Sequence, residues 1–194
     1  MHDANPVATP GDRSSGGTEE SVGGHVPYRE AVGCLMYLMT GTRPDIAFAV
    51  SRAARAMDRL TEAECIDVKR ILKYLRGTSN YGLLYGAGNS KGVLQAFSDA
   101  NFAGDGRTRL STSGVVAVYA GSVIAWSSHL QRSLALSTTE AEFIAASERA
   151  KELIWLKRML GELGGKGNEV PTLYRSFATR VSQIKMCGFF RRDF

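Results

Sequence analysis

The chain has 194 residues, 44% of them hydrophobic, which is enough to bury a core, yet it contains no run of the roughly 18 apolar residues that a membrane span needs. Its formal net charge is +5, but residues 175–194 hold five basic residues against one acidic residue, which leaves 19 basic and 18 acidic residues elsewhere. The bulk of the chain is therefore nearly neutral, which argues against a strongly basic surface over the folded core.

The N-terminal segment, residues 1–24, is rich in Gly, Ser, Thr and Asp and holds almost nothing to bury. We therefore predict a disordered leader there. Its first residues contain no apolar segment of the kind found in secretory signals. The three cysteines of the chain are odd in number and widely spaced, so we expect them to be reduced and the chain to be intracellular.

Residues 25–78 have the apolar spacing of three consecutive helices. Pro27 and Pro44 are acceptable in the first turn of a helix and open the first two. The third opens with the capping box of residues 61–64, in which Thr61 is the cap and Glu64 follows three residues later. Gly77 is its predicted C-cap. We interpret this segment as a packing module whose Met and Tyr residues fill the core.

Short apolar runs bounded by turn residues follow and predict strands. One covers residues 81–85, and a three-stranded antiparallel meander covers residues 93–97, 114–119 and 123–127. A long helix then runs from Ser137 to about Leu163, with a predicted core stripe of Phe143, Ala146, Ala150, Leu153 and Leu160. Residues 170–174 have the pattern of a further strand.

The order strand, strand, strand, helix, strand predicts an α/β fold. We expect a mixed sheet of three antiparallel strands, a crossover helix and a partial fourth strand, preceded by the helical segment. We interpret His129, an isolated histidine in a polar loop, as a surface residue. The three histidines of the chain are too scattered for a zinc site.

Two acidic residues stand out within this pattern. Asp99 ends an apolar run, and Glu140 lies in the first turn of the long helix. Sites that hold two Mg2+ ions need several carboxylates converging from different elements, so this placement is one from which a metal-dependent nuclease site can be built. Each residue also has a structural explanation. Asp is common at strand ends because it forms turns, and Ser137 to Glu140 is itself a capping box, with Glu142 offering a second register.

Several ordered motifs occur at Tyr28–Leu38, Thr42–Ile46, Ile71–Thr78, Ser98–Asp105, Ser111–Gly114, Leu136–Phe143 and Ile154–Leu156. They closely resemble the C-terminal part of copia-type LTR retrotransposon Pol polyproteins, over roughly residues 26–174. By this resemblance, residues 25–78 correspond to the end of the reverse transcriptase and residues 79–174 to the ribonuclease H domain.

The resemblance implies an RNase H-like fold, incomplete at its C-terminus, and a reaction in which two Mg2+ ions assist hydrolysis of the RNA strand of an RNA–DNA hybrid. By motif match, Asp99 is the metal-bridging aspartate, and Glu140, rather than Glu142, is the helix glutamate. The expected partner is RNA paired with DNA, recognised partly through its 2′-hydroxyls, and not a membrane.

The chain also departs from the family pattern. Asn101 and Phe102 replace an Asp-Trp pair, Ser176 stands where a third metal-ligating aspartate is expected, and the likeness stops after Tyr174. Residues 175–194 therefore have the character of an unrelated basic tail. We expect a truncated Pol fragment that is inactive or nearly so. Two alternatives stay open: a residual Mg2+-dependent ribonuclease H, and a non-catalytic remnant that binds nucleic acid.

Overall fold

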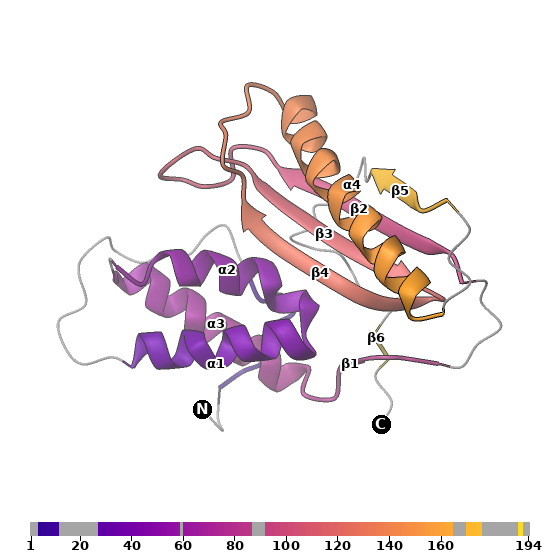
Figure 1. The fold of residues 1–194 in the computed structure, drawn as a ribbon. Coiled ribbons are helices and arrows are strands. Elements are labelled where there is room, and N and C mark those ends of the chain that lie inside the picture. Colours follow the sequence, from indigo (N-terminus) through magenta and orange to yellow (C-terminus); the bar gives the residue numbers. More distant parts are fainter. Residues whose placement is uncertain are drawn as a thin grey trace. The chain divides into compact units, whose positions relative to one another are not determined.

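The computed structural model describes residues 4–11, 27–58, 60–86, 92–164, 170–175 and 190–191. The chain divides into two compact units, one formed by residues 1–82 and 191–194 and the other by residues 83–190. The first unit is helical, and the second is a sheet with a long helix packed on it (Figure 1). Within the described residues no helix is both long and apolar enough to cross a membrane.

The helical unit consists of three α-helices and a 3-10 turn. Helix α1 spans Tyr28–Gly41, the 3-10 turn η1 spans Pro44–Ile46, α2 spans Ala47–Arg55 and α3 spans Glu62–Gly77. The predicted capping box of α3 is confirmed, since the backbone N–H of Thr61 donates to the Glu64 carboxylate at 3.0 Å. Apolar side chains from all these elements form one core, which includes Val32, Leu35, Ile46, Val50, Val68 and Ile71.

Part of the segment predicted as a leader lies against this unit. Val7 packs on its core, the Arg70 side chain donates to the Thr9 hydroxyl at 3.1 Å, and Arg76 donates to the carbonyl of Ala4. These contacts give residues 4–11 specific partners, mainly on α3. The rest of the predicted leader lies outside the described residues.

A buried polar network joins the motifs at Thr42–Ile46 and Ile71–Thr78. Arg43 donates from Nε and Nη2 to the two carboxylate oxygens of Asp45 at 3.0 and 2.8 Å, and from Nη1 to the carbonyl of Thr78 at 2.9 Å. The Tyr74 hydroxyl donates to Asp45 at 2.7 Å. A two-pronged ion pair inside a core depends on all of its partners. The role of these motif residues in stabilising the helical unit is therefore enough to account for their presence.

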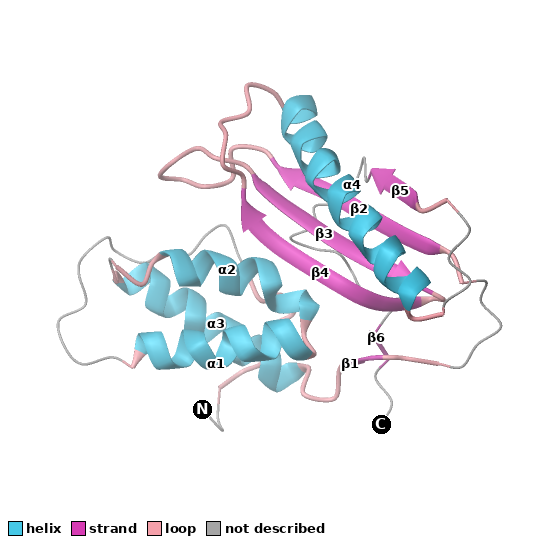
Figure 2. Ribbon diagram, in the orientation of Figure 1, coloured by secondary structure: helices cyan, strands magenta, loops and turns pink. Residues whose placement is uncertain are grey.

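The second unit is built on a four-stranded mixed sheet (Figure 2). Strands β2 (Leu94–Asn101), β3 (Thr112–Tyr119) and β4 (Ser122–Leu130) form an antiparallel meander, and β5 (Thr172–Arg175) pairs in parallel with β2. Helix α4 (Thr138–Glu162) connects β4 to β5, and the strand order is β4-β3-β2-β5. The predicted mixed sheet and its connecting helix are thus confirmed.

The first predicted strand of this region, residues 81–85, is shorter than expected. Only β1 (Gly82–Leu83) is a strand, and it pairs with β6 (Phe190–Arg191) in a separate two-stranded sheet. A strand of two residues presents too few backbone groups to extend the main sheet, which begins at β2.

Helix α4 covers one face of the main sheet, but not with the predicted stripe. Its buried residues are Ala141, Ala145, Arg149, Leu153 and Leu156. Of the predicted stripe only Leu153 is fully buried, and Phe143 is 73% exposed. The sheet surface beneath the helix explains the error. It includes the small residues Ala96 and Ala117, so alanines fit the close helix–sheet contact, and the buried row includes an arginine that a search for apolar residues passes over.

Candidate functional site

Asp99 lies in β2 two residues before the end of the strand, and it is only 8% exposed, which is unusual for a carboxylate. Side chains alternate between the two faces of a sheet. Ala96 packs toward α4 and Phe97 packs in the core on the opposite face, so Asp99 projects on the Phe97 face. Its cross-strand partner is Gly114, which has no side chain to fill the space beside the carboxylate. Because the strand continues past Asp99, turn formation does not explain this residue.

The N-terminal half of α4 lies over the same end of the sheet. Gln131, which follows β4, donates from Nε2 to the carbonyl of Ala141 at 2.8 Å. Ser113, which is paired with Ala100 of β2, donates to Glu148 at 3.2 Å. The first turns of the helix are therefore held near the end of β2 that carries Asp99.

The two glutamates of the first turns of α4 point in different directions. The Glu140 carboxylate accepts a hydrogen bond from the backbone N–H of Leu136 at 2.7 Å, and the Glu140 N–H donates to the Ser137 hydroxyl at 3.1 Å, so this residue caps the helix. Successive residues are rotated by roughly 100° around a helix. Glu140 therefore lies on the side opposite the buried row of α4, whereas Glu142 lies beside that row and is half-buried.

Ser176, where the resemblance leads us to expect a third aspartate, lies outside the described residues, as does Asp193. Strand β5 places Tyr174 opposite Phe97 and Arg175 opposite Ser98, one position short of Asp99. The Phe97 and Tyr174 rings stack with their centroids 5.1 Å apart. This stacking fixes the register of β5 beside the strand that carries the candidate site.

The described residues do not complete a two-metal site. Asp99 and Glu142 carry oxygen donors of the kind that Mg2+ prefers, but Asp99 projects on the face of the sheet opposite the one that α4 covers. Asp105 is engaged elsewhere, because its carboxylate accepts hydrogen bonds from the Thr108 N–H at 2.9 Å and the Thr108 hydroxyl at 2.6 Å. Across the part of the chain that the structure describes, no group of three or more His, Cys, Asp or Glu side chains is placed to hold a metal ion. A site for two Mg2+ ions needs more carboxylates than this.

The loop between β2 and β3 presents two arginines at the Asp99 end of the sheet. Its hydrogen bonds are local: the Arg109 N–H donates to the Asp105 carbonyl at 2.9 Å, and the Asp105 N–H donates to the Leu110 carbonyl at 3.2 Å. Arg107 and Arg109 are both exposed. Such a loop can contact phosphate groups without specifying a base sequence.

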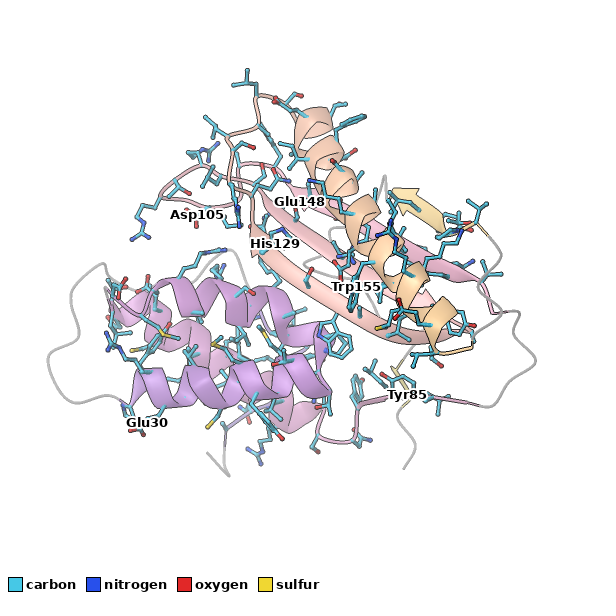
Figure 3. All side chains as sticks on the ribbon, in the orientation of Figure 1. Glu30, Tyr85, Asp105, His129, Glu148 and Trp155 are labelled. Carbon is cyan, nitrogen blue, oxygen red and sulfur yellow. The ribbon has the colours of Figure 1, made fainter. Side chains whose placement is uncertain are left out.

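A polar cluster that the sequence did not indicate lies on the α4 side of the same sheet end. His129 is exposed, as expected, but it belongs to β4 and its Nε2 lies 3.0 Å from Glu148 Oε2 (Figure 3). Gln131 Nε2 donates to Ser113 Oγ at 3.0 Å, and Ser113 in turn donates to the same glutamate. The cluster holds α4 to β3 and β4. Its members come from separate elements, so no local pattern points to them.

Curated proteins similar to this chain include retrotransposon polyproteins. The chain is 45% identical over 173 residues to the retrovirus-related Pol polyprotein from transposon TNT 1-94 of Nicotiana tabacum, which covers 84% of this chain and 13% of that protein. It is 40% identical over 147 residues to the retrovirus-related Pol polyprotein from transposon RE1 of Arabidopsis thaliana, which covers 76% of this chain and 10% of that protein. The chain thus spans a small part of the length of these relatives.

A shorter relative is matched over nearly its whole length. The chain is 44% identical over 133 residues to the secreted RxLR effector protein 161 of Plasmopara viticola, which covers 68% of this chain and 92% of that protein. No family model matches the chain. No solved structure matches it either.

Proposed function

Since this chain belongs to the copia-type retrotransposon Pol family, of whose polyproteins it spans a fragment, we propose that its second unit is an RNase H-like domain with little or no remaining nuclease activity. Asp99 carries the proposal. It is a buried carboxylate on an interior strand of a mixed sheet, it faces a glycine, and the next helix begins over the same end of that sheet. In this proposal the substrate of the intact domain is the RNA strand of an RNA–DNA hybrid.

The expected loss of activity follows from the number of carboxylates. A site for two divalent ions needs several converging carboxylates, and the described residues offer no group of three. Asp99 and Glu142 are the two carboxylates that remain. Within this proposal Glu142, and not the helix-capping Glu140, is the helix carboxylate closer to the sheet, because of its position on α4. This choice is the reverse of the one that the motif match favours. Asp99 projects on the face of the sheet opposite the one that α4 covers, which further weakens the site.

The test is cleavage of a labelled RNA–DNA hybrid by the purified chain in Mg2+ and in Mn2+, beside the matched variants Asp99→Asn, Glu142→Gln and Glu140→Gln. We expect no cleavage above the Asp99→Asn background from protein whose circular dichroism shows it to be folded. Cleavage by the wild-type chain that is lost in Asp99→Asn would contradict the proposal that the domain has little or no nuclease activity. In that case loss of activity in Glu142→Gln but not in Glu140→Gln would identify the helix ligand.

The arginine loop favours a second function, binding of nucleic acid without cleavage. Arg107 and Arg109 stand on a hydrogen-bonded loop at the end of the sheet where the hybrid would lie. Anisotropy of a labelled hybrid, measured over a salt series, tests this function. Replacing both arginines by alanine should weaken binding and reduce the slope of log K against log salt by about 1–2, since each phosphate contact contributes about 0.9. An unchanged slope, equal to that of the control Lys69→Ala on α3, would rule out this loop as the binding surface.

A further inference from the structure

The side of α4 that faces away from the sheet carries large apolar side chains. Phe143 is 73% exposed, Ile154 is 55% exposed and Trp155 is 59% exposed. Trp155 is labelled on α4 in Figure 3. With roughly 100° between successive residues, these three side chains lie on the half of the helix opposite the buried row that begins at Ala141 and Ala145. Exposed aromatic residues gathered along one helix are typical of an interaction surface.

Opposite charges lie at the two ends of this apolar surface. From the N-terminus the outer side presents Glu140, then Phe143, then Ile154 and Trp155, then Arg158, all of them exposed. Glu140 and Arg158 are separated by roughly 27 Å along the helix axis, so they cannot pair with each other within one straight helix. When a second copy of α4 lies antiparallel to the first, the acidic end of each helix lies against the basic end of the other, and the apolar side chains lie against apolar side chains. The surface is therefore complementary to an antiparallel copy of itself.

The charged pair and the aromatic pair share one centre. Arg149 is midway in the sequence between Glu140 and Arg158, and it is also midway between Phe143 and Trp155. A single two-fold axis at this level of the helix brings each Glu140 opposite the Arg158 of the other copy, because 18 residues are about five whole helical turns. It also brings each Phe143 to the level of Ile154 and Trp155 of the other copy. A closed dimer with one self-complementary patch has this symmetry.

We propose that this outer face of α4 binds a second copy of the chain, with the two α4 helices antiparallel across a two-fold axis midway between Glu140 and Arg158. Phe143 of each copy then packs against Ile154 of the other, and Trp155 lies at the same level on the other flank of the contact. Each Glu140 faces an Arg158 of the other copy, and the two-fold axis makes this pair twice. A parallel arrangement would place like charges against each other at both ends, and their repulsion would oppose it.

The middle of the surface has one residue that permits this contact and one that opposes it. Ser147 is exposed and small, so it allows the two helix axes to approach. Lys151 is exposed on the same side, close to the level of the axis. The two copies of Lys151 would therefore lie near each other, and their ammonium groups would have to extend outward into solvent. Removing this charge should strengthen the dimer.

Glu140 and Arg158 each also have an explanation within a single chain. The experiment must distinguish that explanation from a role in the dimer. Glu140 caps α4 through the N–H of Leu136. Arg158 and Glu162 are four residues apart, a spacing that suits an ion pair along one helix. Neither role needs a partner. The proposal does not depend on nuclease activity or on nucleic-acid binding, so its outcome is independent of the proposed function.

The experiment measures association of the whole chain by sedimentation velocity over a concentration series, with Glu140→Arg and Arg158→Glu made separately. We expect the wild-type chain to dimerise and each variant to associate about tenfold more weakly, because both symmetric pairs become like-charge pairs. An equimolar mixture of the two variants should regain the wild-type association, since both charge pairs between the two different chains again join opposite charges. Mixing cannot restore a cap or an ion pair within one helix, which excludes the single-chain explanations.

Controls keep the test independent of folding. Phe143→Ser should abolish association without lowering thermal stability, because the side chain is already exposed in the single chain. Lys151→Ala should strengthen association, and Glu30→Arg, the same charge change on α1, should leave it unchanged. A monomer at every concentration, or a mixture that associates no better than each variant alone, would overturn the proposal.

Discussion

Arg149 is a charged residue inside the contact between α4 and the sheet, and replacing it by methionine should stabilise the second unit. Its side chain is only 1% exposed, and burial lowers its pKa because desolvation disfavours the charged form. Nη1 pairs with Glu152 at 2.7 Å, and Nη2 donates to Ser127 Oγ at 3.4 Å. Within the described structure Nε has no hydrogen-bond partner.

The expected rise in stability comes from comparing the cost of burying the Arg149 charge with the energy of its ion pair and hydrogen bond. Burying a charged group costs several kcal/mol. The ion pair offsets little of this, since the Glu152 side chain is 38% exposed and pairs with one partner in solvent contribute about 1 kcal/mol or less. The 3.4 Å hydrogen bond is long. Methionine follows the path of the arginine stem and keeps its apolar contacts. We expect the free energy of unfolding to rise by about 2 kcal/mol, within the range seen when apolar residues replace buried ion pairs.

Urea unfolding followed by tryptophan fluorescence measures this change. Both tryptophans, Trp126 and Trp155, belong to the second unit, so the signal reports on that unit. With a typical dependence of about 1–3 kcal/mol per molar urea, the midpoint should rise by about 1 M. As a control, Glu152→Gln should lower the midpoint, because it leaves the arginine buried without its counter-charge. If Arg149→Met lowers the urea midpoint by as much as Glu152→Gln does, or by more, the reasoning is refuted.

Further predictions concern both units. Asp45→Ala leaves Arg43 buried without its two-pronged partner and should cost about 3–5 kcal/mol, measured by circular dichroism during urea unfolding; a cost under about 1 kcal/mol would contradict the network. Burial raises the pKa of Tyr28 and Tyr74 above their ordinary value of 10.0. The unfolded chain then loses these protons first, so the stability of the helical unit is complete below about pH 10 and falls above it by about 1.4 kcal/mol per pH unit for each tyrosine. Tyr28→Phe should therefore make this decline less steep, and an equal slope would contradict the assignment. Ser137→Ala removes the N-cap of α4 and should cost about 1 kcal/mol by tryptophan-detected unfolding, whereas no change would show that the cap is dispensable.

Local chemistry made the helices of this chain predictable. Thr61 and Ser137 were expected to open α3 and α4, and both occupy the N-cap position. A cap satisfies backbone N–H groups within the next few residues, so its effect does not depend on the rest of the fold. The short apolar runs bounded by turn residues likewise predicted the three antiparallel strands, because turn residues mark where each strand ends.

The orientation of the candidate site was not predictable in the same way. The motif at the start of α4 contains two glutamates, and nothing within it says which one turns toward the sheet. That choice depends on the buried row of the helix, which the sequence pattern placed on the wrong side by including Phe143 and omitting Arg149. An apolar pattern assumes that core residues are apolar, and this helix buries an arginine and exposes a phenylalanine.

The sequence by itself predicted the chain's family, the number and order of its main helices and strands, and Asp99 and Glu140 as candidate site residues, since all of these depend on local patterns. Only the tertiary structure decided which residues meet: Arg43 with Thr78, His129 with Glu148, and Asp99 opposite Gly114 in the register of β2 and β3. These partners are 15 to 35 residues apart in the chain. Their contacts arise from how the helices and strands pack, and packing depends on the whole surface of each element at once.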